Sequence, residues 1–426
     1  KPTAGGRTVR RTHPLIHSHT LHLLRLFRPS EYSNRIVRSF DTTRRKLADF
    51  HSYNHTPTYR MTEVTYANDT RVTGYEPLMS PSLLMHELPV SEKAKATIAR
   101  GRDEAARVIR GEDDRLLVIV GPCSIHDVDQ AKEYARRLHE AYEQRWKDGL
   151  VVVMRAYFEK PRTTVGWKGL INDPDLDGSY KINRGLRIAR QLLLDLTEIG
   201  IPVACEVLDT ISPQYLSDLY SWGAIGARTT ESQLHRELVS GLSMPIGFKN
   251  STDGGIGVAV DAIRASSQPH AFMGVTDQGM AAIVKTAGNQ DLHIIHRGGK
   301  RGTNYDAESV ATSKAELLKA LSDKHPSIMI DVSHGNSNKD YRNQPKGSAD
   351  IAAQIEQGQD AITGIMIESH IHEGKQSEPK NGSTRADLAY GVSITDGCVS
   401  FETTVDMLDQ LHAAVLKRRQ QKQQKQ

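Results

Sequence analysis

The sequence is poor in cysteine and contains no long apolar run. Only Cys123, Cys205 and Cys398 occur among 426 residues. An odd and sparse set of this kind does not supply a disulfide framework, so we expect a protein of a reducing compartment. No stretch of about 18 apolar residues is present, and we therefore expect no membrane span. Hydrophobic residues make up 38% and charged residues 25% of the chain, a balance typical of a soluble globular protein.

The net charge is small, +4, but it is unevenly distributed. Residues 1–60 hold 12 Lys or Arg and 3 Asp or Glu, whereas the remainder holds 43 and 48. The mildly acidic main part gives no reason to expect a nucleic-acid partner, and the basic segment carries no recognisable nucleic-acid-binding module. We expect residues 1–60 to be an unstructured or non-native extension. The alternatives are a functional arm or a targeting peptide for an organelle. We expect the protein to be cytoplasmic unless residues 1–60 are such a targeting peptide.

Short apolar runs alternate with amphipathic stretches beyond residue 110. The expected strands are Leu116–Val120, Val151–Met154, Ile201–Ala204, Ala224–Ala227, Pro245–Phe248, Leu292–Ile295, Ser327–Ile330 and Ile362–Ile367. These runs are mostly continuous, as expected for strands buried on both faces. The expected helices include Val128–Trp146, Gly185–Ile199, Ser212–Trp222, Thr230–Leu242 and Ser309–Leu321.

Eight strands alternating with helices predict an α/β protein, a (β/α)₈ TIM barrel with an N-terminal extension. A doubly wound open sheet is the alternative. It needs a Gly-rich nucleotide turn after its first strand, and residues 121–124 (GPCS) are not such a turn. We divide the chain into the extension 1–60, an arm and helix over 61–110, the catalytic barrel over 111–419, and a flexible tail over 420–426.

An ionisable side chain follows every expected strand. In chain order these residues are Cys123, Arg155, Glu206, Arg228, Lys249, Arg297, Asp331 with His334, and Glu368. The C-terminal ends of barrel strands converge on one mouth, where the catalytic residues of such enzymes lie. A single charge at a strand end is usually a cap or a rim salt bridge. Eight in succession favour an active site, because charges gathered around a partly enclosed mouth are costly unless they pair or meet a ligand.

The charges divide this mouth into two halves. The cationic half comprises Arg155, Lys160, Arg162, Arg228, Lys249 and Arg297. Carboxylates of the protein alone could neutralise this cationic half. Bound phosphate or carboxylate ligands are the favoured partners, because the guanidinium group of Arg binds their oxygens bidentately. The other half comprises Cys123, His334, Glu368 and Asp396. Taken singly, Cys123 reads as a small buried hydrophobe and His334 as a loop histidine. Together they predict a site for one divalent metal, Mn²⁺, Fe²⁺, Co²⁺ or Zn²⁺, acting as a Lewis acid on a carbonyl oxygen.

Long segments around these residues resemble a known family. They are GPCSIHD (121–127), MRAYFEKPRTTVGWKGLINDP (154–174), GARTTESQLHRELVSGLSMPIGFKNSTDG (226–254), RGGK (297–300), DVSHGNS (331–337), IESH (367–370) and SITDGC (393–398). The chain resembles the type I 3-deoxy-D-arabino-heptulosonate 7-phosphate (DAHP) synthases from about Val72 to Arg419. The resemblance implies an enzyme of the shikimate pathway, which makes the precursors of aromatic amino acids. It would condense phosphoenolpyruvate (PEP) with erythrose 4-phosphate and water, and release phosphate.

The resemblance also implies roles for individual residues. The family's metal ligands fall on Cys123, His334, Glu368 and Asp396. Its residues for PEP and erythrose 4-phosphate fall on Arg155, Lys160, Pro161, Arg162, Thr163, Glu206, Ala227, Arg228, Lys249 and Arg297. Of these two sets, Lys160, Glu206, His334 and Asp396 are the expected catalytic residues, with Glu206 and Asp396 as candidates for moving protons.

Members of the family are inhibited by an aromatic amino acid at a separate site. The matching positions are Gln214, Leu238, Leu242, Ser243, Phe272, Gly274 and Val284. Gly274 leaves room that a serine would fill, and its surroundings resemble tyrosine-sensitive forms. We expect tyrosine as the inhibitor, with the turn-forming role of a glycine as the alternative. The family also implies a homodimer or homotetramer.

Two further functions remain open at the level of sequence. A synthase of octulosonate 8-phosphate shares the barrel and the PEP chemistry, but its chains lack the segment seen here as Leu78–Arg110. A catalytically inactive barrel that acts as an amino-acid sensor or assembly partner is the second. It predicts the loss of a metal ligand or a phosphate-binding cation, and all of these positions are filled.

Overall fold

The structure is a computed structural model that describes residues 68–162, 164–379 and 384–425. The chain divides into two compact units, Lys1–Tyr75 and Glu76–Gln426. Within the first unit, the hydroxyl of Tyr75 donates a hydrogen bond to the carboxylate of Asp69 at 3.1 Å. The helix considered near residues 16–27 lies outside the described residues. Everything below concerns the second unit.

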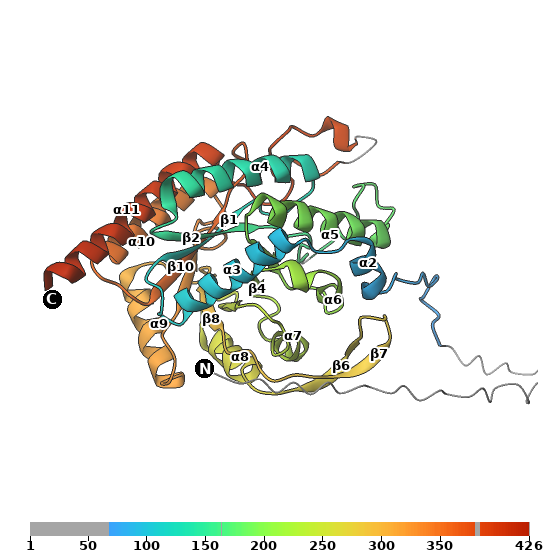
Figure 1. The fold of residues 1–426 in the computed structure, drawn as a ribbon, viewed down its shortest axis with the longest axis horizontal. Helices are drawn as coiled ribbons and strands as arrows, with labels where there is room; N and C mark the ends of the chain where they lie inside the picture. The colour runs from blue at the N-terminus through green and yellow to red at the C-terminus, as the bar shows by residue number, and fades with distance from the viewer. Residues whose placement is uncertain (1–67, 163, 380–383, 426) are drawn as a thin grey trace, which may run out of the picture. The chain divides into compact units, whose positions relative to one another are not determined.

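Eight parallel strands form a closed barrel (Figure 1) in the order β1-β10-β9-β8-β5-β4-β3-β2. They are β1 (Leu116–Gly121), β2 (Leu150–Arg155), β3 (Val203–Glu206), β4 (Trp222–Ile225), β5 (Ile246–Lys249), β8 (Leu292–His296), β9 (Ile328–Asp331) and β10 (Ile362–Glu368). The barrel closes because β1 pairs in parallel with both β2 and β10. The predicted (β/α)₈ barrel is confirmed, and the open sheet is excluded.

Burial on both faces explains the continuous apolar runs. Every residue of β1, β2 and β10 is buried. Alternate side chains fill the interior, where Leu117, Ile119 and Val153 cluster with Ala105 and Ile109 of α3 (Glu92–Ile109). Helix α3 also binds the chain just before β4, where Arg102 donates to the carbonyl of Tyr220 at 2.8 Å. It therefore closes the N-terminal end of the barrel and leaves the C-terminal end open for a site.

Helices surround the barrel. The remaining helical segments are α2 (Pro81–Glu87), α4 (Val128–Ala141) continued by the π-helical η1 (Tyr142–Trp146), α5 (Ile182–Ile199), α6 (Pro213–Leu216) continued by η2 (Ser217–Leu219), α7 (Gln233–Val239), α8 (Gly257–Ser266), α9 (Ala307–Ala320), η3 (Tyr341–Asn343), α10 (Gln344–Glu356), η4 (Arg385–Asp387) and α11 (Phe401–Lys425). Helix α11 runs beside α10 and continues through Lys425 (Figure 1). None of the described helices is long and apolar enough to cross a membrane.

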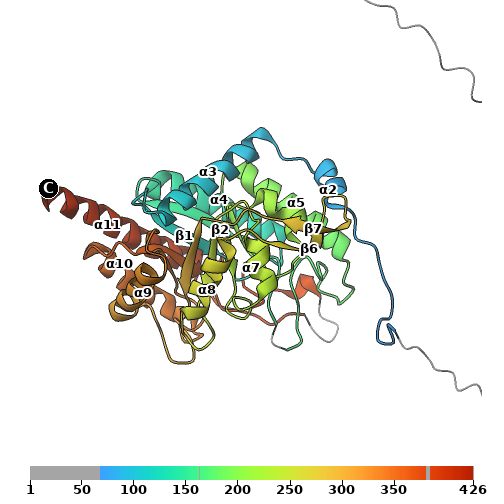
Figure 2. The ribbon, with the colours of Figure 1, turned by 90° about the horizontal axis from the view of Figure 1, so that it is seen from below.

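Two features differ from the sequence prediction. The helix expected over Ser212–Trp222 ends at Leu219, and the prediction is wrong at its C-terminal end, because Trp222 opens β4. There it pairs with Ala204 and donates to the ring of His293. An antiparallel hairpin outside the barrel was not expected. It consists of β6 (Ala271–Val275) and β7 (Ala281–Lys285) and lies beside α7 (Figure 2).

Candidate active site

A cavity of about 320 Å³ opens among the residues that follow the C-terminal strand ends. Its lining consists of Lys160, Pro161, Arg162, Thr164, Val165, Glu206, Gly226, Ala227, Arg228, Thr229, Lys249, Thr252, Arg297, His334, Thr395 and Asp396. A larger cavity of about 820 Å³ lies between the 166–180 and 378–386 segments, and none of the predicted site residues lines it. The chemistry therefore belongs to the smaller cavity, where the predicted residues converge.

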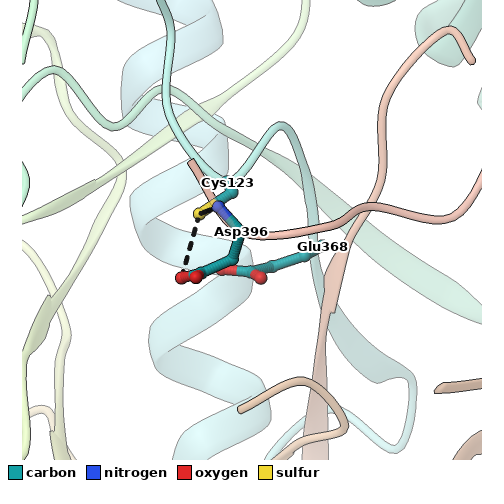
Figure 3. A group of neighbouring side chains, drawn as sticks. All are labelled: Cys123, Glu368 and Asp396. Atoms are coloured by element: carbon teal, nitrogen blue, oxygen red, sulfur yellow. Dashed lines mark hydrogen bonds between the residues drawn. The ribbon is translucent and has the colours of Figure 1, made fainter. Parts of the chain in front are cut away.

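Three of the four predicted metal ligands form a compact cluster. The thiol of Cys123, at the turn after β1, and the carboxylates of Glu368 and Asp396 each offer a ligand atom, and these atoms lie within 4.8 Å of one another (Figure 3). The Cys123 Sγ lies 3.6 Å from Oδ2 of Asp396 and also accepts the Asp396 backbone N–H at 3.4 Å. This thiol after β1, with one carboxylate at the end of β10 and another in the loop before α11, suits a transition metal better than Mg²⁺.

The fourth predicted ligand, His334, lies at the edge of this cluster. Its Nε2 is 3.8 Å from Oε1 of Glu368, while its Nδ1 faces Oδ2 of Asp331 at 3.0 Å. The backbone of His334 is left-handed, with φ at 55°, a conformation that costs free energy for a residue other than glycine. The loop after β9 thus holds this imidazole next to the carboxylate cluster against a local conformational preference.

Burial and neighbouring charges act strongly on the cluster. Burial, with Glu368 and Asp396 nearby, raises the pKa of the Cys123 thiol to about 12. The ammonium of Lys160 donates to Cys123 Sγ at 3.2 Å. Burial alone would lower the pKa of Lys160, but Cys123 and Glu368 raise it, so the side chain stays charged. A metal must therefore displace the thiol proton, and Lys160 is placed to stabilise the thiolate that results.

The cations divide into paired and unpaired groups. Arg155 is 1% exposed and does not line the cavity. Its guanidinium bonds to Oε1 of Glu368 at 3.2 Å and to the carbonyl of Cys123 at 3.3 Å. Lys249 pairs with Asp331 at 2.8 Å. Both cations therefore have carboxylate partners within the protein.

Arg228 and Arg297, in contrast, bond only to carbonyl groups. The Arg228 guanidinium donates to Pro161 at 2.9 Å and that of Arg297 to Gly298 at 3.4 Å. Within the described part of the chain, neither forms an ion pair. Burial, and then the Arg228 charge, lower the pKa of Arg297, against the opposing effect of Asp331. Two guanidinium groups at a cavity wall without counter-ions form a site for an anion.

Other predicted substrate residues line the same cavity. Pro161, Arg162 and Ala227 line the cavity, while Thr163 lies outside the described residues. Arg162 donates to the carbonyl of Trp167 at 2.7 Å and lies 3.9 Å from Glu378.

Residues 87–409 of the chain match the DAHP synthetase I family. The chain belongs to this family. A tyrosine-inhibited phospho-2-dehydro-3-deoxyheptonate aldolase of Candida albicans is 60% identical over 362 residues, 85% of this chain and 97% of the relative. A phenylalanine-inhibited enzyme of Saccharomyces cerevisiae is 55% identical over 353 residues, 82% of this chain and 95% of the relative. The solved structure of the Francisella tularensis aldolase matches with a TM-score of 0.78 and 49% identity, over 82% of this chain and 99% of that one.

Family membership makes the chain an enzyme, a DAHP synthase of aromatic amino acid biosynthesis. The predicted family and activity are confirmed, and nothing supports the inactive barrel.

The predicted effector residues gather around the β6–β7 hairpin of this synthase. Phe272 pairs with Val284 across the two strands, and the side-chain amide of Gln214 on α6 donates to the carbonyl of Val275. A Cβ atom on Gly274 would lie 2.7 Å from a methyl of Val284. Leu238 lies on α7, which neighbours β6, and Leu242 and Ser243 follow that helix. The family resemblance thus predicts effector binding for residues of this hairpin, although the hydrophobic periodicity of the sequence did not predict the hairpin itself.

Sequence reasoning missed two neutral residues that hold the site. The buried amide of Gln344, at the start of α10, donates to the carbonyl of Glu368 and accepts its N–H, both at 2.9 Å. Asn250, directly after Lys249, accepts the N–H of Arg297 at 2.7 Å. Extending the strand-end search to amides would have found Asn250, but no local signal marks Gln344.

Proposed function

We propose that this DAHP synthase condenses PEP with erythrose 4-phosphate at the cavity of the barrel mouth, using one divalent metal per subunit. The observation that carries the proposal is the division of one cavity into a thiol–carboxylate side and a cationic side. The first suits a metal that activates a carbonyl group, and the second suits two phosphorylated substrates.

The residues present fit a divalent metal. Cys123, His334, Glu368 and Asp396 offer sulfur, nitrogen and oxygen donors, and three of them already lie within 4.8 Å of one another. Such mixed ligation favours Mn²⁺, Fe²⁺, Co²⁺ or Zn²⁺. When bound, the metal would supply Lewis-acid polarisation of the aldehyde oxygen of erythrose 4-phosphate.

The cationic residues would bind and orient the substrates. Arg228 and Arg297, which lack ion-pair partners among the described residues, would hold the PEP phosphate, with Lys249 and Lys160 at its carboxylate. Arg155 does not line the cavity and would act indirectly, by holding the carboxylate of Glu368 in place through a hydrogen bond. Pro161, Arg162, Thr163 and Ala227 belong to the proposed substrate set as well.

Glu206 is a candidate for the proton transfers. It lines the cavity at the end of β3, and Gly226 leaves the space that its carboxylate occupies, since a Cβ there would collide with Oε1. The reaction joins C3 of PEP to the aldehyde carbon, whose oxygen gains a proton. A water then adds to C2 and loses a proton, and the C2–O bond to phosphate breaks. Glu206 would take up the proton of the water, with Asp396 as the alternative group.

We further propose inhibition by tyrosine through the hairpin residues, and a homodimer or homotetramer. Gly274 and the name of the Candida albicans relative support the first proposal. Activity measured with each aromatic amino acid tests it, and inhibition by phenylalanine at least as strong as that by tyrosine contradicts it.

Phosphate release from PEP tests the main proposal. The protein is stripped of metal, restored with each divalent metal in turn, and assayed with and without erythrose 4-phosphate. We expect release that needs both metal and aldehyde, is lost in Cys123→Ala, and persists in Cys205→Ala. Cys205 is a matched control because it is also buried and its Sγ donates to the Trp222 carbonyl, at 4.0 Å, rather than facing the carboxylate cluster. A folded protein that releases no phosphate with any of these metals refutes the proposal.

A further inference from the structure

One buried carboxylate touches both halves of the active site. Asp331, the last residue of β9, is 0% exposed. Its Oδ2 atom accepts a hydrogen bond from Lys249 Nζ at 2.8 Å and faces Nδ1 of His334 at 3.0 Å. A single oxygen therefore contacts both a proposed PEP cation and a proposed metal ligand.

The neighbours of His334 fix its tautomer. Oδ1 of Asp331 accepts the backbone N–H of Ser333 at 3.0 Å and its hydroxyl at 2.5 Å. Because the Ser333 proton points to that carboxylate, its oxygen is free to accept from Nδ1 of His334, 2.6 Å away. Both partners of Nδ1 are thus acceptors, so Nδ1 carries the proton. Nε2 lies on the side of Glu368, 3.8 Å from its Oε1.

We propose that Asp331 is a positioning residue that couples the metal site to the PEP site. The inference rests on the proposed function for the identity of the two ligands. With a metal held by His334 and the Cys123–Glu368–Asp396 cluster, His334 would be a stronger donor at Nδ1 and would draw Oδ2 of Asp331 toward itself. The bond from Lys249 to that same oxygen weakens, and its ammonium becomes available to an anion. By reciprocity, an anion bound to Lys249 strengthens the bond from Asp331 to His334 and tightens metal binding.

A purely structural role for Asp331, as the counter-ion of buried Lys249, makes a different prediction. Loss of the carboxylate would then lower stability without changing how the two ligands affect each other. Measurements of binding in the absence of turnover distinguish the two roles.

The experiment titrates the full chain with Mn²⁺, following the free ion by electron paramagnetic resonance, with and without PEP. In the wild type we expect PEP to tighten Mn²⁺ binding. In Asp331→Asn we expect Mn²⁺ binding without PEP to be about 10- to 100-fold weaker, the usual effect of losing a carboxylate behind a ligand histidine. In the same variant, the ratio of Mn²⁺ affinities with and without PEP (the PEP factor) should fall toward one. Asp114→Asn makes the same chemical change at the Arg419 ion pair, outside the cavity, and should leave both values unchanged.

Unchanged Mn²⁺ affinity in Asp331→Asn overturns the positioning role, and an unchanged PEP factor overturns the coupling. Should Asp331→Asn fail to fold, Ser333→Ala decides, since it keeps the charge but removes the hydroxyl that contacts Asp331 and His334. We expect weaker Mn²⁺ binding there, and wild-type affinity overturns the inference. A wild type that binds both ligands with coupling, yet forms no condensation product, contradicts the proposed function and leaves this inference intact.

Discussion

Replacement of Glu159 by Gln should remove a pH-dependent loss of stability. Glu159 is 8% exposed, and its Oε2 accepts the hydroxyl of Ser212 at 2.9 Å. Burial, and then the charge of Asp209, raise its pKa from 4.5 to about 8. The folded protein therefore keeps a proton that the unfolded chain releases above pH 4.5. The stability contributed by this proton is fully present below pH 4.5 and is lost as the pH rises toward 8.

The pKa gives the size of the effect. With 1.36 kcal/mol for each pH unit, ionisation of Glu159 favours the unfolded chain by about 1.4 kcal/mol at pH 5.5 and about 4.3 kcal/mol at pH 8. Glutamine resembles the neutral acid in shape and does not ionise. Relative to the wild type, Glu159→Gln should gain about 3 kcal/mol in free energy of unfolding between these two pH values.

Urea unfolding followed by circular dichroism at pH 5.5, 6.5, 7.2 and 8 measures this gain. Glu316→Gln, at an exposed position of α9, is the matched control and should track the wild type at every pH. Parallel curves for Glu159→Gln and the wild type would show that Glu159 is ionised in the folded protein, which refutes the reasoning.

Three further predictions concern other parts of the barrel. Arg190→Ala should lower the free energy of unfolding by roughly 3–5 kcal/mol in urea unfolding, because this 1% exposed guanidinium forms a two-fold ion pair with a carboxylate. Gly274→Ser should raise the tyrosine concentration needed for half inhibition while leaving uninhibited turnover unchanged, because its side chain would crowd Val284; unchanged tyrosine sensitivity contradicts this. Gln344→Leu should weaken Mn²⁺ binding about 10-fold in the same resonance titration, because it frees the backbone of Glu368, and wild-type affinity would exclude that role.

The strands were predictable because a parallel barrel leaves a simple trace in the sequence. Each strand is buried on both faces, so its apolar run is continuous and stands out from the amphipathic helices. The hairpin left no such trace. Met273 is 93% and Ile283 74% exposed, so apolar residues lie on its outer face and mask the expected alternation. Trp222 was wrongly predicted to be helical for a related reason. Its strand conformation depends on burial within the barrel, which the amphipathic pattern of residues 212–222 does not indicate.

The site was predictable as far as strand ends define it. Because the C-terminal ends of parallel strands meet, Cys123 and Glu368 come together although 245 positions separate them in the sequence. What a strand-end search leaves open is how each charge is used. Arg155 was expected to face PEP, and in the structure its guanidinium bonds to Glu368 instead. Ion pairs of this kind depend on the distances between side chains at the barrel mouth, and the order of residues in the sequence does not give those distances.

The pairing pattern itself explains why the mouth attracts anions. Lys160 lies against the Cys123 thiol, and Lys249 against the Asp331 carboxylate, so each of these cations already has a partner within the protein. The positive charge left without a protein counter-ion in the described residues is that of Arg228 and Arg297. Burial, and then the charge of Arg228, lower the pKa of Arg297. An anion bound between the two guanidinium groups would stabilise both charges, which favours a phosphate group at this wall of the cavity.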